Sequence, residues 1–213
     1  MGNVLLTLLL SHANRLYSIE GNLFPDISGS KGHQLPDFSY LFSYYSSNYQ
    51  DGESYSFINQ LDENGNLLDF NMLNDPGYYF NIRRFLILPD GNLLLLIRRT
   101  FSFSNQSEII LSKYSPNFEM LWTRSFHDGG NALWGLELTT SINGGVIIVG
   151  NVGIYSLSGT FIDTQAFALG TDSLGNELWR RQYGSPVLAE NILSIVPIGD
   201  GGFLLAGYSK QPF

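Results

Sequence analysis

Ala166–Gly184, AFALGTDSLGNELWRRQYG, and Glu190–Ser209, ENILSIVPIGDGGFLLAGYS, together decide the fold of this chain. Each stretch consists of two short apolar segments on either side of a turn that contains glycine. The Asp200-Gly201 step supplies the positive φ angle that a tight hairpin requires, and Leu174-Gly175-Asn176 forms the other turn, so both stretches are predicted to be β-hairpins. No segment of ten or more residues shows helical apolar periodicity between capping residues, and we therefore expect essentially no helix.

The same two turns recur along the whole chain. The first turn is centred on residues 13, 65, 118 and 175, and the second on residues 38, 91, 144 and 201. Within a repeat the two turns are 25 or 26 residues apart, and the repeats recur every 52 to 57 residues. A period near 50 residues is typical of a supersecondary unit that is stacked around an axis or along a rod.

Each repeat contains four short strands, which we call A to D, and such antiparallel units indicate the blades of a β-propeller. The chain begins with strands C and D (4–20), runs through three complete units and ends with strands A and B (191–208). We expect the two ends to pair into one blade, which would cover strand edges that otherwise invite aggregation. The prediction is an all-β, four-bladed propeller of four-stranded antiparallel blades. It forms a single domain over 1–213, with repeats at about 21–71, 72–125 and 126–183 and a closing blade from 184–213 and 1–20.

The apolar run Val4–Leu10 allows a second interpretation, a short signal peptide cleaved after Ser11-His12-Ala13. However, no positive charge precedes the run, and its length is at the minimum for such a peptide. The repeat register also makes it equivalent to Ala166–Gly170, so a strand is favoured. No other segment approaches the apolar length that spans a bilayer, and we expect no membrane insertion.

The composition excludes several classes of partner and chemistry. The formal net charge is -8 and the 11 Lys and Arg residues are scattered, whereas nucleic-acid binding usually requires a basic stripe. The absence of cysteine excludes thiol catalysis, cysteine-ligated zinc and disulfides, but it does not decide the compartment. Hydrophobic residues make up 44% and charged residues 14%, with 23 glycines, which is typical of all-β chains and far from a disordered composition.

Residues 166–208 resemble the tandem β-propeller repeats of secreted bacterial proteins, with their D-x-x-G-x-x-x-W and D-G-G-[FY]-x-x-A-G-[YF] signatures. Trp122 and Trp179 occupy the signature tryptophan position, whereas Tyr17 and Asp69 replace it in the first two copies, and Phe38 stands where the turn glycine belongs. The resemblance implies an exported or surface-located protein. Because members of this group often have more than four blades, it also allows a homodimer that forms a larger ring, besides a monomer.

Strand A lines the central channel of a propeller. Aligning the repeats places four residues at one ring position, on the face opposite to Leu136, Leu138, Leu193 and Ile195. These channel-lining candidates are Lys31, Arg84, Glu137 and Ser194. Three charges at one position indicate a polar channel, either a water-filled lumen with a compensating ion cluster or a ligand site.

The loops between strands D and A and between strands B and C form the face where propeller ligands usually bind. Flat aromatic rings bind the apolar side of pyranose rings, while carboxylates and amides take the hydroxyls, so a glycan is one candidate ligand. The candidate residues are Trp134, His127, Asp128, Tyr49, Asp51, Tyr78 and Tyr79. Most aromatic residues between 38 and 57 alternate along strands, which indicates packing between blades and not ligand binding.

Sharper chemical motifs are missing from the sequence. The three histidines, His12, His33 and His127, have no metal-ligand spacing, and neither a nucleophile elbow nor a phosphate loop occurs, so no metal and no cofactor are expected. The leading hypothesis is a non-enzymatic module that binds a glycan or a protein through its loop face. The alternative is a carbohydrate-active hydrolase or lyase with acidic residues at the channel mouth, Glu137 above all. A purely architectural ring, whose function is assembly, is the third possibility.

Overall fold

A computed structural model describes the backbone of residues 4–10, 15–21, 26–35, 37–48, 53–101, 106–156, 158–184 and 189–210. Side chains are described within these ranges from residue 32 onward, except at residues 46–48 and 53. The described residues form sixteen β-strands and no helix, which confirms the predicted all-β class. The strands are β1 (Val4–Leu10), β2 (Arg15–Gly21), β3 (Asp26–Gln34), β4 (Tyr40–Asn48), β5 (Glu53–Leu61), β6 (Leu67–Leu73), β7 (Tyr78–Ile87), β8 (Leu93–Phe101), β9 (Ser107–Tyr114), β10 (Met120–Phe126), β11 (Ala132–Thr140), β12 (Val146–Tyr155), β13 (Phe161–Thr171), β14 (Glu177–Tyr183), β15 (Ala189–Pro197) and β16 (Phe203–Lys210).

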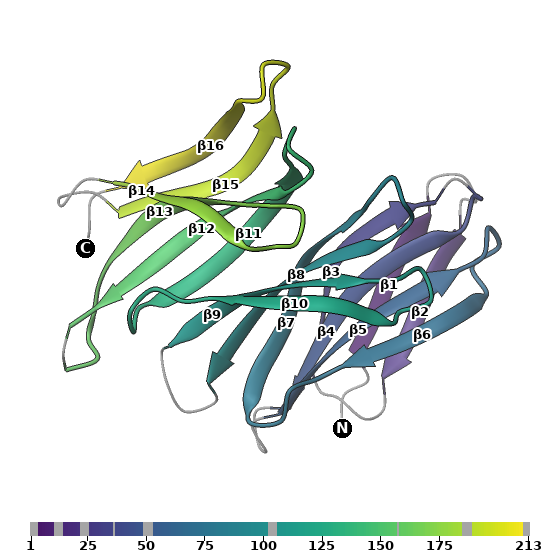
Figure 1. Ribbon diagram of the computed structural model, residues 1–213. Helices are drawn as coiled ribbons and strands as arrows, with labels where there is room; N and C mark the ends of the chain where they lie inside the picture. Colours follow the sequence, from purple (N-terminus) through teal and green to yellow (C-terminus); the bar gives the residue numbers. More distant parts are fainter. Residues whose placement is uncertain are drawn as a thin grey trace. The chain divides into compact units, whose positions relative to one another are not determined.

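The strands form three four-stranded sheets and two hairpins, all with neighbours in sequence order (Figure 1). The sheets are β3–β6, β7–β10 and β11–β14, and the hairpins are β1–β2 and β15–β16. The predicted repeat of four antiparallel strands is therefore confirmed. The chain divides into two compact units, Met1–Ile82 and Arg83–Phe213, with the boundary inside β7.

The two terminal hairpins reproduce the strand registers of the complete sheet β11–β14. Val4 pairs with Gly21 and Leu8 with Tyr17 in β1–β2, just as Ala166 pairs with Tyr183 and Gly170 with Trp179 in β13–β14. In the same way β15–β16 carries the register of β11–β12, including its bulge. The hairpins therefore correspond to the two halves of one four-stranded sheet.

The first strands of three repeats, β3, β11 and β15, contain a β-bulge at the same position. The register shifts between Gly29 and Lys31 in β3, between Gly135 and Glu137 in β11 and between Ile192 and Ser194 in β15. A bulge adds one residue to a strand and so breaks the alternation of faces.

The expected alternation of strand A is correct only beyond this bulge. Leu138 and Ile195 are buried as expected, but Leu193, the extra residue in β15, is 56% exposed.

The glycine of the A-G-Y signature lies opposite the bulge. A Cβ atom on Gly150 would overlap the carbonyl oxygen of Trp134 and lie 2.8 Å from its carbonyl carbon. Gly207 is equally close to the carbonyl of Asn191. Glycine leaves room for this close approach at both positions, whereas Tyr44 occupies the equivalent place opposite the bulge of β3.

Two of the C–D turns, at Asp172 and Asp62, are each held by an aspartate that accepts hydrogen bonds from its own turn. Asp172 Oδ1 accepts from the backbone N–H groups of Leu174 and Asn176, at 2.9 and 2.8 Å, and Oδ2 accepts from the Asn176 side chain at 2.8 Å. The hydrogen bond from the Asn176 side chain, followed by the backbone bonds, lowers the pKa of Asp172. The same turn recurs at Asp62. Phe38 adopts a φ of 67°, so it does occupy the glycine position of its turn, as the repeat register predicts.

The core of the second unit lies between consecutive sheets. One cluster joins β7–β10 to β11–β14 and includes Leu96, Leu111, Ile148 and Phe167, all fully buried. A second cluster joins β11–β14 to the β15–β16 hairpin. Because consecutive sheets of this unit pack face to face, the loop between β10 and β11 lies beside β8, β9 and β14. The candidate site is located at this loop.

The aromatic residues of the first unit form a packed cluster within one sheet. Phe42, Tyr44 and Phe57 are buried, and the ring of Tyr44 stacks on those of the other two at centroid distances of 5.9 and 4.7 Å. Packing is therefore the role of these three residues, although this cluster lies within one sheet, and the predicted packing between blades stays a prediction.

Candidate functional site

The loop between β10 and β11 carries two of the candidate residues, His127 and Asp128. It bends through Gly129 and Gly130, whose φ angles are 55° and 102°. Asp128 closes the bend, since Asn131 donates its backbone N–H to the Asp128 carbonyl at 2.9 Å and its side-chain amide to Asp128 Oδ2 at 3.2 Å.

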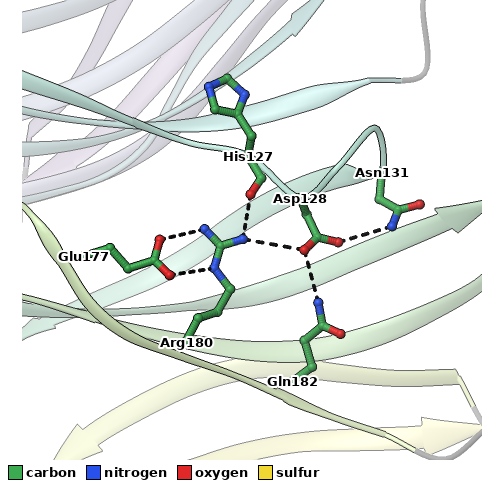
Figure 2. Close-up of polar contacts among 6 residues, drawn as sticks. All are labelled: His127, Asp128, Asn131, Glu177, Arg180 and Gln182. Atoms are coloured by element: carbon green, nitrogen blue, oxygen red, sulfur yellow. Dashed lines mark hydrogen bonds and ion pairs between the residues drawn. The ribbon is translucent and has the colours of Figure 1, made fainter.

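Two side chains of β14 fix this loop (Figure 2). Gln182 donates to Asp128 Oδ1 at 3.2 Å, and Arg180 Nη1 lies 3.6 Å from the same oxygen. Arg180 Nη1 also donates to the His127 carbonyl at 2.7 Å, while Glu177 accepts from two other atoms of the guanidinium. The Asp128 carboxylate thus anchors its own loop, and a ligand would have to compete with these donors for it.

His127 extends from the loop over a buried carboxylate. Its side chain is 66% exposed, and its Nδ1 atom lies 2.9 Å from Glu108 Oε2. Glu108 is 2% exposed and also forms an ion pair with Arg99, its direct cross-strand partner between β8 and β9. Glu108 Oε2 is buried and has no hydrogen-bond partner among the described residues, so the nearby His127 ring is its closest polar neighbour across the loop.

Trp134, near the start of β11, is a packed side chain. The guanidinium of Arg98 lies over its ring, 5.2 Å from the centroid. The benzene edge of the indole occupies the space beside Gly153, where a Cβ atom would lie 2.8 Å from the ring. The Nε1 donor is buried and has no acceptor among the described residues. One face of the ring is therefore covered by a cation, as in a cation–π pair, and is not open to a sugar.

Arg84 and Glu137 form an ion pair between the first strands of two consecutive sheets. Arg84 Nε donates to Glu137 Oε2 at 3.0 Å, and the two side chains are 29% and 18% exposed. Two of the channel-lining candidates therefore contact each other, and their place in a channel stays a prediction. Ser194 occupies the equivalent place after the bulge of β15. Lys31 has the equivalent backbone place in β3, and its side chain lies outside the described residues.

The remaining candidates are Tyr78, Tyr79, Tyr49 and Asp51. Tyr78 and Tyr79 are half-buried residues at the start of β7, in the first unit of the chain. Tyr49 and Asp51 lie outside the described residues. Their part in ligand binding remains a prediction.

Several charged residues that were not predicted from the sequence surround His127 and Asp128. Arg99 and Glu108 could have been found from the β8–β9 hairpin register, which places them directly opposite each other. No sequence signal connects Arg180 and Gln182 with a loop more than 50 residues earlier, because only the packing of the folded chain brings them together.

Within the described ranges, no group of three or more acidic or histidine side chains is arranged to hold a metal ion. The described part of the chain also contains no helix that is long and apolar enough to cross a membrane.

Comparison with known proteins identifies no family. No protein-family model matches the chain, and no curated protein matches it either. Among solved structures, a variant of the apocarotenoid oxygenase of Synechocystis is similar over 98% of this chain, at 13% identity and a TM-score of 0.47. The match covers 58% of the oxygenase chain.

Proposed function

We propose that the chain is a four-bladed β-propeller whose fourth blade joins the hairpin β15–β16 to the hairpin β1–β2. The support is the strand register, because each hairpin has the pairing of one half of β11–β14. In that blade β16 pairs with β1 as β12 pairs with β13. Since Ile147 pairs with Gly170, the equivalent partners are Leu204 and Leu8.

The exposure of β16 also supports this closure. In β12, which has a neighbour on both sides, Ile147, Ile148 and Val149 are at most 5% exposed. In β16, which pairs only with β15 among the described strands, Leu204 is 63% and Tyr208 50% exposed. An apolar strand with an open edge is an aggregation hazard, which pairing with β1 removes.

Hydrogen exchange tests the closure. In a closed ring, the amides of β16 exchange as slowly as those of β12, because both strands are hydrogen-bonded on two sides. Fast exchange of those β16 amides that do not bond to β15, with the amides of β12 protected, is the result expected of an open hairpin and would reject the closed blade.

The function that we propose for this ring is non-enzymatic binding of a glycan or a protein through the face that carries the β10–β11 loop. One observation carries the choice between binding and hydrolysis: Glu137, the natural candidate for an acid catalyst, is paired with Arg84. A substrate would have to displace the Arg84 guanidinium before this carboxylate could act on it. Glu108 and Asp128 are paired with cations as well.

A thermal-shift screen against oligosaccharides, with and without calcium, tests the binding function. A ligand at about 100 times its Kd adds about 2.7 kcal/mol to the free energy of unfolding. A shift with one sugar class that is lost in His127→Ala, whose side chain is exposed, supports a glycan site at this loop. The exposed Leu178→Ala is the matched control and keeps the shift. No shift with any sugar leaves a protein as the partner, which immobilised chain should then retain specifically.

The hydrolase or lyase is the second candidate, because the same acidic residue lies at the expected ring position. Incubation of the chain with the same oligosaccharides, followed by analysis of the products, separates the two. Turnover by the wild type that Glu137→Gln abolishes, with binding retained, would replace the binding module by an enzyme.

A further inference from the structure

A cavity of about 530 Å³ lies between the sheets β7–β10 and β11–β14, at the end of the strands opposite to the β10–β11 loop. Its wall is mainly apolar and includes Leu94, Trp122 and Val146, and its rim includes the exposed Ile142. The volume falls in the range of about 300–1,000 Å³ that is usual for small-molecule sites.

The next interface of the same unit shows what fills this place when it is occupied. There Trp179, the repeat equivalent of Trp122, stacks on Phe203 with ring centroids 5.8 Å apart and planes within 3°. Phe203 lies two residues after the turn glycine of its repeat. In the preceding repeat, the residue two positions after the turn glycine is Val146. The cavity beside Trp122 therefore lies where this repeat has a valine and the next repeat has the ring of Phe203.

Polar side chains in the cavity wall indicate which functional group the ligand carries. Lys113, whose side chain is 18% exposed, donates to Asp90 Oδ2 at 3.2 Å, and this is the only partner of its ammonium among the described residues. An ammonium has three donors, so two remain for a ligand. Asp90 is 52% exposed, and its carboxylate also accepts from the backbone N–H and the side-chain amide of Asn92, which leaves room for about one more hydrogen bond. A hydroxyl at this point would accept from Lys113 and donate to Asp90.

We propose that this cavity binds a phenol: a flat ring that packs beside Trp122, as Phe203 does on Trp179, with its hydroxyl at Lys113 and Asp90. The two charges of that pair cancel, so an uncharged ring is preferred over an amine or a carboxylate. The shared chemistry is found in free phenolic compounds and in the tyrosine side chain of a partner protein. This site is separate from the loop face and does not depend on the function proposed for it.

Calorimetric titration of the full chain with p-cresol, complemented by saturation-transfer NMR, tests the proposal. We expect saturable binding with a Kd of about 1 mM or tighter, and weaker binding of toluene, which lacks the hydroxyl. Val146→Phe should reduce binding by at least about tenfold while the urea midpoint stays equal or rises, because the new ring fills the cavity. Ile162→Phe, at an exposed position outside the cavity, is the matched control and should bind as the wild type does.

Two further experiments test the polar contact with Lys113 and distinguish a free phenol from a tyrosine side chain. Lys113→Met keeps the apolar stem and should remove the preference for p-cresol over toluene. Binding of the tripeptide Gly-Tyr-Gly as well as p-cresol identifies a protein-borne tyrosine as a possible occupant, and binding of p-cresol alone identifies a free phenol. Absence of saturable p-cresol binding by the wild type, or unchanged binding by Val146→Phe, would overturn the proposal.

Discussion

The substitution Gly150→Ala tests the close approach of β11 and β12 at the bulge. A Cβ atom at this position overlaps the Trp134 carbonyl oxygen, and it lies 2.8 Å from the carbonyl carbon and 2.9 Å from Cε1 of Phe167. Neither neighbour can move easily, because one is backbone in a paired strand and the other is a fully buried ring. Overpacking of this kind costs about 1–3 kcal/mol, and we expect the upper half of that range because a backbone atom is involved.

Gly199→Ala is the matched control. A Cβ atom there meets no atom within 4 Å, and the backbone needs no positive φ. Alanine at such a position leaves the free energy of unfolding unchanged or raises it by about 0.4–1 kcal/mol, since it restricts the unfolded chain. Urea titrations compare the free energies of unfolding of the two variants. Tryptophan fluorescence reports on unfolding of the second unit, because all three tryptophans lie in it. The Tm of Gly150→Ala should fall by about 4–12 °C. Equal stability of Gly150→Ala and Gly199→Ala would refute the reasoning.

Three other changes probe the ion pairs and the turns. Glu137→Gln should lower the free energy of unfolding by about 1 kcal/mol or less, because the pair with Arg84 is partly exposed, and the loss should shrink in 1 M salt; a salt-independent loss would contradict this. Asp172→Asn should destabilise at neutral pH, and the difference from the wild type should vanish as the pH falls below the ordinary pKa of 3.8. A lowered pKa gives stability that is present above that value and lost on protonation; a difference that persists at pH 2 would contradict the assignment. Arg180→Ala should speed hydrogen exchange in the β10–β11 loop without changing exchange in β12, and unchanged loop exchange would remove its anchoring role.

Turn chemistry explains how much of the fold the sequence predicts. The glycines at 91, 144, 175 and 201 all adopt positive φ, as hairpin turns require, and the apolar segments between them are strands. The bulge in strand A was not foreseen, because a single extra residue leaves the apolar pattern almost unchanged. Leu193 is therefore exposed, although alternation alone predicts it to be buried.

The candidate site was predictable only in part, for a different physical reason. His127, Asp128 and Trp134 were chosen from residue type and loop position, which say nothing about how their polar atoms and ring faces are already engaged. Arg180 holds the loop from another strand, and Arg98 covers the indole ring. Such contacts depend on the spacing of neighbouring sheets, which a repeat pattern does not specify residue by residue.

The central claim, closure of a four-bladed ring by the chain's own ends, is tested most directly by engineered cysteines. The chain has no cysteine, so Leu8→Cys with Leu204→Cys introduces a single possible pair. The repeat register makes these residues cross-strand neighbours, within reach of a disulfide. Leu5→Cys with Leu204→Cys is the control, because residue 5 faces the opposite side of its strand. The account predicts a disulfide within one chain for the first pair and little for the second. No disulfide in the first pair, or only disulfides between two chains, would contradict closure within a single chain.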